Sequence, residues 1–333
     1  MTVLFVGSEI ESFDLYDINQ EMVTTAGRHD SDFARGSIEL NGGPDGTGIA
    51  KDFTGQTSVW LHFNVNPEWN ADTNYDHPVA ILHDTVSGED TLRLEGLNGN
   101  LHLQYWNGAT YTSRQGIADF QLTTDVVQRV DIECVIHDTT GRFAVYVNEV
   151  LMDEFTGDTN LYASAQVDRI YLKGPTIFRT TDEEYWFSEV VVADESTVGW
   201  RVATLAPTGV GTTGAWTGLW SDVDEVIADD TDFIDSDTAN QVETFATGNL
   251  SVAASAMEVV ALVVNARVRK GSSGPAQVQL AVNSGVTDYF SATMALDPGF
   301  IPIQNIWETD PDTAAPWTVS GVDAVEIGVK SIT

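Results

Sequence analysis

The stretch from Val130 to Phe155 (VDIECVIHDTTGRFAVYVNEVLMDEF) constrains the fold more than any other part of this chain. Apolar residues occupy every second position of two runs, first Val130, Ile132, Cys134 and Ile136, then Phe143, Val145 and Val147. A period of two indicates strands with one buried face, because successive side chains point to opposite faces of a sheet. The connector 138–141 ends in a glycine, as hairpin loops of three to five residues often do. We therefore predict a β-meander whose apolar face is covered by a second sheet, that is, a β-sandwich.

The same alternation recurs along the chain as far as residue 195. In residues 58–66 (SVWLHFNVN), Val59, Leu61, Phe63 and Val65 fall on one face. No helical period persists for three turns before residue 195, so this part is predicted to be all-β. Residues 196–215 are rich in glycine and threonine and are predicted to be a linker. We therefore expect a first domain over 1–195 and a second over 216–333.

The second domain is also predicted to be a β-sandwich, smaller than the first. Residues 257–269 and 276–282 are expected to form a hairpin around the Gly-Ser-Ser-Gly sequence at 271–274. Residues 322–330 are expected to form a last strand. The predicted fold class is all-β throughout.

Two family resemblances accompany these patterns. The D-x-x-G turn at 138–141, the following FAVYVN strand and the closing V-L-x-x-x-F strand resemble concanavalin A-like, or laminin G-like, jelly-roll domains. That resemblance implies a two-sheet sandwich and says little about function, because such folds carry many different sites.

The second resemblance covers residues 216–333 and concerns structural proteins of tailed bacteriophages. It rests on five segments in order, namely WSDVDE at 220–225, DDTDFI at 229–234, VVNARVRK at 263–270, DPDTAAPWT at 310–318 and VEIGV at 325–329. The resemblance implies a virion component located in the virus particle, with other virion proteins and further copies of the chain as partners. Its role there would be capsid decoration, collar, fibre or tail appendage.

The charge excludes some functions. The net charge is −35, from 50 acidic and 15 basic residues, so the surface repels phosphate backbones and anionic membranes. We expect neither a nucleic-acid nor a membrane partner. The N-terminal sequence lacks the basic region of a signal peptide and no apolar run is long enough to span a bilayer, so synthesis in the host cytoplasm is expected. The single cysteine, Cys134, permits no internal disulfide and is predicted to be buried.

Calcium is the one cofactor that the acidic residues suggest. Carboxylates at short spacing are the hard oxygen ligands that Ca²⁺ prefers. The candidate ligands are Asp229, Asp230, Asp232, Asp235 and Asp237. The EF-hand pattern is not satisfied, so the alternative is a solvated acidic turn.

No catalytic motif is present, and the chain is not expected to be an enzyme. Retaining glucanases on a concanavalin-like fold carry E-x-D-x-x-E on one strand, to supply a nucleophile and an acid. The nearest match, at Glu308, Asp310 and Asp312, lacks the final glutamate and contains Pro311. We therefore expect no catalytic residues and no hydrolysis of polysaccharides.

Aromatic residues beside amides give a candidate glycan-binding site. Such side chains bind sugars, although aromatic residues serve equally well as core or interface anchors. The candidates are Trp69, Asn70, Tyr75, Trp106, Asn107 and Tyr111. The main expectation is thus a non-enzymatic structural component of a phage particle. The alternative is a module of that particle that binds a host receptor or a host surface glycan, and a carbohydrate-active enzyme is third.

Overall fold

The computed structural model describes residues 2–7, 9–16, 21–41, 48–68, 77–97, 100–113, 120–162, 165–175 and 184–333. The chain divides into two compact units, Met1–Val202 (unit 1) and Ala203–Thr333 (unit 2). The division lies inside the segment 196–215 that the sequence predicts to be a linker. Residues Pro207–Gly214 of that segment form a strand, β16, which pairs with β17 (Val242–Thr247) of unit 2.

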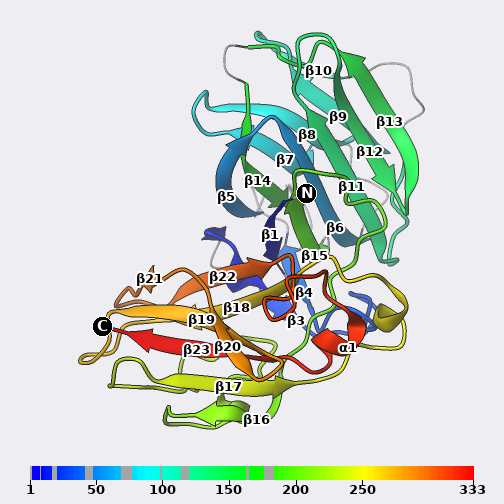
Figure 1. The fold of residues 1–333 in the computed structure, drawn as a ribbon. Coiled ribbons are helices and arrows are strands. Elements are labelled where there is room, and N and C mark those ends of the chain that lie inside the picture. Colours follow the sequence, from blue (N-terminus) through cyan, green and yellow to red (C-terminus); the bar gives the residue numbers. More distant parts are fainter. Residues whose placement is uncertain are drawn as a thin grey trace. The chain divides into compact units, whose positions relative to one another are not determined.

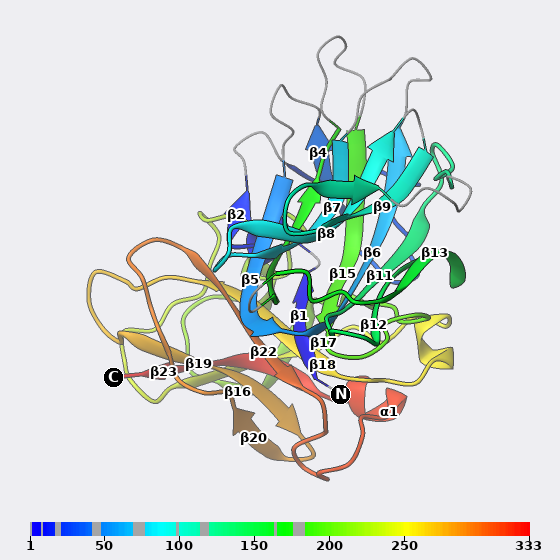
Figure 2. The same cartoon turned by 90° about the horizontal axis from the view of Figure 1, so that it is seen from above.

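Unit 1 is a sandwich of two antiparallel sheets, which Figures 1 and 2 show from two directions. The eight-stranded sheet has the order β13-β12-β11-β6-β15-β4-β3, with β1 also paired to β15. Its strands are β1 (Val3–Gly7), β3 (Glu21–Val23), β4 (Ser37–Asn41), β6 (Ser58–Glu68), β11 (Gln128–Val135), β12 (Gly141–Val147), β13 (Val150–Gly157) and β15 (Glu184–Ala193).

The second sheet of unit 1 has seven strands in the order β10-β9-β8-β7-β14-β5-β2. They are β2 (Leu15–Tyr16), β5 (Gly48–Gln56), β7 (His77–Asp84), β8 (Glu89–Leu97), β9 (Asn100–Trp106), β10 (Tyr111–Ser113) and β14 (Val167–Lys173). A short 3-10 turn, Ile10–Ser12, follows β1.

The core of unit 1 lies between the two sheets. Phe63 of β6 and Phe187 of β15 pack edge to face at 5.5 Å, and Tyr105 of β9 reaches across the core to Phe143 of β12 at 5.7 Å. The predicted meander at 130–155 is confirmed as β11, β12 and β13, paired in that order. Cys134 is buried, as predicted, and burial raises the pKa of its thiol.

Unit 2 is the smaller sandwich that the sequence predicts. One sheet has the order β16-β17-β23-β19-β20, with β21 also paired to β19, and the other consists of β18 and β22. The strands not yet given are β18 (Leu262–Val268), β19 (Gln277–Ser284), β20 (Thr287–Phe290), β21 (Met294–Ala295), β22 (Ile301–Trp307) and β23 (Glu326–Ile332). The single α-helix among the described residues is α1 (Val319–Val322), and no described helix has the length and hydropathy to cross a bilayer.

The hairpin predicted from residues 257–269 and 276–282 is wrong. β18 pairs with β22 over its whole length, whereas β19 pairs with β23, β20 and β21. The two strands face each other across the core, where Val264 of β18 and Leu280 of β19 belong to one buried cluster with Trp317. Local alternation marks both strands correctly but does not determine which sheet each joins.

Candidate functional site

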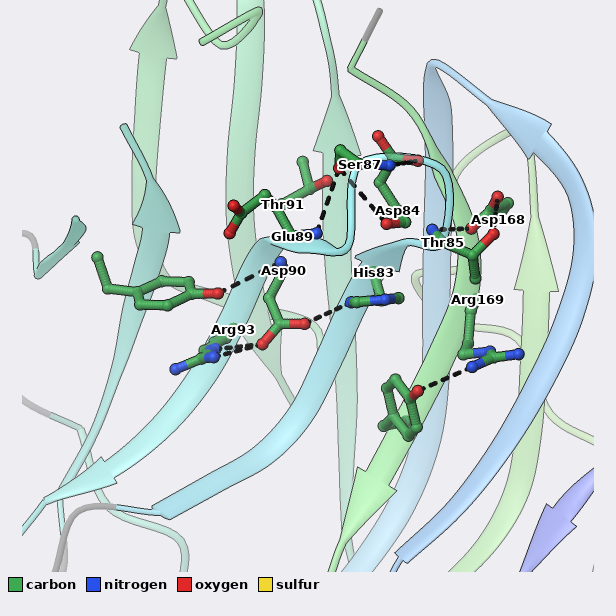
Figure 3. A network of polar contacts seen from close by, with 12 residues as sticks. His83, Asp84, Thr85, Ser87, Glu89, Asp90, Thr91, Arg93, Asp168 and Arg169 are labelled. Atoms are coloured by element: carbon green, nitrogen blue, oxygen red, sulfur yellow. Dashed lines mark hydrogen bonds and ion pairs between the residues drawn. The ribbon is translucent and has the colours of Figure 1, made fainter. Parts of the chain in front are cut away.

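The outer face of the seven-stranded sheet carries a network of polar contacts (Figure 3). The alternation of side chains separates the two faces of this sheet. Leu82, Leu92 and Leu103 point into the core and are buried. The intervening positions place polar and aromatic side chains outward on β7, β8, β9, β10 and β14, and we call this the outer face.

Asp90 is the centre of the network. Its Oδ1 lies 2.6 Å from His83 Nδ1, and its Oδ2 accepts a hydrogen bond from Arg93 Nε at 2.6 Å. Its backbone N–H donates to the hydroxyl of Tyr111 at 3.3 Å. Burial raises the pKa of Asp90, but the hydrogen bond from His83 and the charge of Arg93 outweigh burial, so the pKa lies below its usual range. The carboxylate is therefore ionised at neutral pH and holds the His83 and Arg93 side chains in place.

Aromatic rings lie directly beside this centre. The Arg93 guanidinium stacks over the ring of Tyr111, 3.5 Å from its centroid, and the rings of Trp106 and Tyr111 lie 5.1 Å apart. The three side chains come from neighbouring strands, because β8 pairs with β9 and β9 with β10. A guanidinium stacked on a ring fixes the orientation of both groups.

A second aromatic group lies on the other side of His83. The His83 ring packs edge to face against Tyr171 of β14 at 5.6 Å. Arg169 Nη1 donates to the Tyr171 hydroxyl at 3.0 Å, and Arg169 also forms a two-pronged ion pair with Asp52. The hydrogen bond that Arg169 donates to Asp52 is the main cause that lowers the pKa of Asp52. His83 thus lies between two cation–aromatic pairs.

The turn after β7 is held rigidly. Asp168 accepts hydrogen bonds from the backbone N–H and the hydroxyl of Thr85, at 2.8 and 2.6 Å. Asp84 accepts from the backbone N–H of Val86 at 3.0 Å. Figure 3 shows Asp84, Thr85 and Asp168 beside the His83–Asp90 contact. These hydrogen bonds hold the start of the turn that connects the strands of His83 and Asp90.

Three of the six predicted glycan-binding residues belong to this face or its edge. Trp106 and Tyr111 lie in contact on the outer face. Asn107 is exposed, but its side chain holds the β9–β10 turn, since Oδ1 accepts from the backbone N–H groups of Ala109 and Thr110. Trp69, Asn70 and Tyr75 lie outside the described residues.

The predicted calcium ligands are not brought together as a cluster. Asp230 forms a two-pronged ion pair with Arg267, at 2.7 and 2.9 Å, and this contact lowers its pKa. Asp229 accepts from the backbone N–H of Thr231 at 2.8 Å, and the backbone of Asp235 pairs with that of Thr217. The Asp237 carboxylate accepts a hydrogen bond from the Thr238 hydroxyl, and the backbone N–H of Asp232 donates one to the Asp229 carbonyl. Among the residues that the structure describes, no three His, Cys, Asp or Glu side chains are arranged to hold a metal ion.

Sequence patterns alone did not single out His83, Asp90, Arg93 or Tyr171. The alternation of β8 (EDTLRLEGL) offered a signal, since Arg93 and Glu95 share the face opposite Leu92 and Leu94. Tyr171 reaches the site only through the pairing of β14 with β7, which joins residues about 90 positions apart in sequence.

Comparisons with known proteins give a fold likeness at low identity. No family model and no curated protein matches the chain. The endo-beta-1,4-glucuronan lyase of the fungus Trichoderma reesei is 12% identical over 58% of this chain and 96% of that one, with a TM-score of 0.46. Cellulose induced protein Cip1 is 15% identical over 60% and 92%, with a TM-score of 0.42. The receptor binding domain of botulinum neurotoxin C/D mosaic serotype is 11% identical over 58% and 48%, with a TM-score of 0.42.

These comparisons correct the main functional expectation. The similar structures reported are polysaccharide lyases, a cellulose-induced protein and receptor-binding domains of toxins, and no phage particle protein is found among the similar structures. The expectation of a non-enzymatic structural component of a phage particle is therefore wrong. The short motifs at 216–333 that suggested it are spread over separate strands and turns of unit 2, and each has a structural role there. Asp230, for example, pairs with Arg267.

Proposed function

We infer that the chain is a glycan-binding protein and that it binds sugar on the outer face of unit 1. The observation that carries this proposal is the pair of tyrosines, Tyr111 and Tyr171, which flank His83 and are each held by an arginine. Sugar rings present apolar faces edged by hydroxyl groups. A surface that recognises them therefore needs aromatic rings beside fixed hydrogen-bonding groups.

The polar groups of this face are fixed before any ligand arrives. Asp90 orients His83 and Arg93, and Arg169 is oriented by Asp52 and Tyr171. Preorganised groups lose little conformational entropy when a ligand binds, which favours affinity. All of these residues lie on strands rather than on loops, so their spacing follows from the sheet.

We propose binding without catalysis. Acid–base cleavage of a glycosidic bond needs one carboxylic acid that is protonated at the working pH. Two carboxylates of the outer face, Asp52 and Asp90, have a lowered pKa because arginine or histidine side chains hold them. Each is committed to an ion pair and is ionised at neutral pH.

The test is a screen of the purified chain on a glycan array, followed by calorimetry with each sugar that binds. Tyr111→Ala removes the ring under Arg93 and should weaken binding about tenfold or more, as expected for the loss of one stacking contact of about 1.5 kcal/mol. Tyr111→Phe keeps the ring and should bind almost as well as the unaltered chain. Trp220→Ala removes a half-buried aromatic side chain from unit 2 and should have no effect.

Two results would contradict the proposal. One is an array on which no glycan is bound by the full chain. The other is a Tyr111→Ala variant that binds as tightly as Tyr111→Phe, since the outer face would then not be the contact surface.

A further inference from the structure

The outer face carries basic residues although the chain is strongly acidic. The whole chain has 15 Lys and Arg residues against 50 Asp and Glu residues. Three of the basic residues point outward from two strands that flank β7, Arg93 from β8 and Arg169 and Lys173 from β14. His83 lies between them on β7. The outer face therefore holds three basic residues beside the carboxylates of Asp52 and Asp90.

The three bases are not used in the same way. Arg169 is fully committed to Asp52 and Tyr171. Arg93 engages Asp90 through Nε and Nη2, and its Nη1 has no partner among the described residues. Lys173 has no carboxylate at ion-pair distance within the part of the chain that the structure describes. Its ammonium group lies 5.4 Å from the Tyr171 ring. Two cationic donors, Arg93 Nη1 and Lys173 Nζ, therefore remain available to a ligand.

The sheet sets the separation of these donors. Arg93 pairs with Ile81 of β7, and Ile81 pairs with Tyr171 of β14, so these three residues are in line across the sheet. Lys173 is two residues farther along β14 on the same face. With strands about 4.8 Å apart and a rise of about 3.3 Å per residue, the Cα atoms of Arg93 and Lys173 are roughly 12 Å apart. A chain with repeated acidic groups can present one group to each of two donors carried at that separation.

Overall charge does not oppose such a ligand at physiological salt. The screening length there is about 8 Å, so most of the net charge of −35 is not felt at the site. The local groups decide the interaction. A guanidinium group forms directional paired hydrogen bonds with a carboxylate, and an ammonium group adds a point charge.

We propose that the glycan bound on the outer face is acidic, with carboxylate-bearing sugars that contact Arg93 and Lys173. This inference rests on the proposed glycan-binding function and adds the class of ligand. Neutral parts of the sugar rings lie against Tyr111 and Tyr171, and acidic groups on alternate sugars reach the two donors. A β-1,4-linked chain turns successive sugars over, so the acids of alternate sugars lie on one side.

The test uses two probes that differ only in the acidic group. They are the β-1,4-linked tetrasaccharide of glucose and the matching tetrasaccharide of glucuronic acid, both titrated into the full chain by calorimetry. We expect the acidic tetrasaccharide to bind at least tenfold more tightly than the neutral one at physiological salt, where the net charge of the chain is screened. Lys173→Gln should reduce affinity for the acidic probe about tenfold and leave affinity for the neutral probe unchanged. Arg93→Lys keeps the positive charge but removes the planar guanidinium group, and it should also weaken binding of the acidic probe. Lys330→Gln, which removes a basic residue from unit 2, is the matched control and should change the affinity for neither probe.

The outcomes separate this inference from the proposed function. Equal affinity for both probes, or binding of the neutral probe alone, overturns the acidic ligand while glycan binding stands. A preference for the acidic probe that survives in Lys173→Gln overturns the assignment of that donor. If neither tetrasaccharide binds and the glycan array is also empty, both proposals fall.

Discussion

Replacing Arg201 with methionine should lower the free energy of unfolding of unit 1 by about 3–5 kcal/mol, the usual cost of removing one partner of a buried ion pair. The Glu189 carboxylate is 1% exposed and accepts two hydrogen bonds from Arg201, from Nε and Nη2, both at 2.8 Å. Without the guanidinium, its hydrogen bonds from the described residues are those from Asn64 Nδ2 at 2.6 Å and the Val202 backbone N–H at 3.0 Å. Methionine keeps an apolar stem against Phe33, so the loss reports mainly on the unpaired charge.

Arg129→Met is the matched control for this substitution. Arg129 lies on the same sheet, in β11, and pairs with Glu149, but the two side chains are 28% and 49% exposed. An exposed pair contributes at most about 1 kcal/mol. Urea unfolding should be followed by hydrogen exchange of peptides from β6 and β15, which reports on unit 1 alone. If Arg201→Met costs no more than Arg129→Met, the claim that buried Glu189 depends on its guanidinium partner is wrong.

Three further outcomes are expected. Burial, and then the charge of Glu11, raise the pKa of Glu9 from 4.5 to about 7, so folding loses stability as the pH rises between these values; Glu9→Gln should stabilise the chain above pH 7 and not below pH 4.5 in thermal melts. A Cβ at Gly328 would lie 1.9 Å from the Glu243 backbone oxygen, so Gly328→Ala should cost unit 2 roughly 1–3 kcal/mol in urea unfolding. Because the pKa of Asp90 lies below 3.8, its carboxylate stays ionised from pH 8 to 5, and sugar binding measured by calorimetry should stay constant over that range.

The strands of unit 1 can be predicted from the local alternation of side chains, whereas the burial of the second face of β6 cannot. Val59, Leu61, Phe63 and Val65 are all fully buried, as the period of two predicts. His62 on the opposite face is also fully buried, because Asp131 and Thr197 cover it: Asp131 Oδ1 lies 2.9 Å from His62 Nδ1 and accepts from Thr197. Thr197 is 135 residues away in sequence. Burial that depends on so distant a segment leaves no periodic signal in the strand itself.

The candidate site divides in the same way into a local and a distant part. Trp106 and Tyr111 meet because one hairpin joins β9 to β10, so their proximity in sequence was informative. His83 and Tyr171 meet through the pairing of β7 with β14. No turn or motif in the sequence marks that pairing, because it depends on the whole topology of the sheet. Sequence reasoning therefore predicted one aromatic group of the outer face and missed the other.

The acidity of the chain also has a structural explanation at several of its sites. Acidic residues hold the arginines in fixed positions, as Asp52 holds Arg169, Asp90 holds Arg93, Glu189 holds Arg201 and Asp230 holds Arg267. With 50 acids available for 15 bases, a basic side chain at the surface readily meets a carboxylate. Lys173, with none at ion-pair distance among the described residues, is therefore unusual within unit 1. Because it lies on the face that carries Tyr171 and Arg93, a carboxylate supplied by a ligand would complete the charge pairing that the chain achieves elsewhere with its own acids.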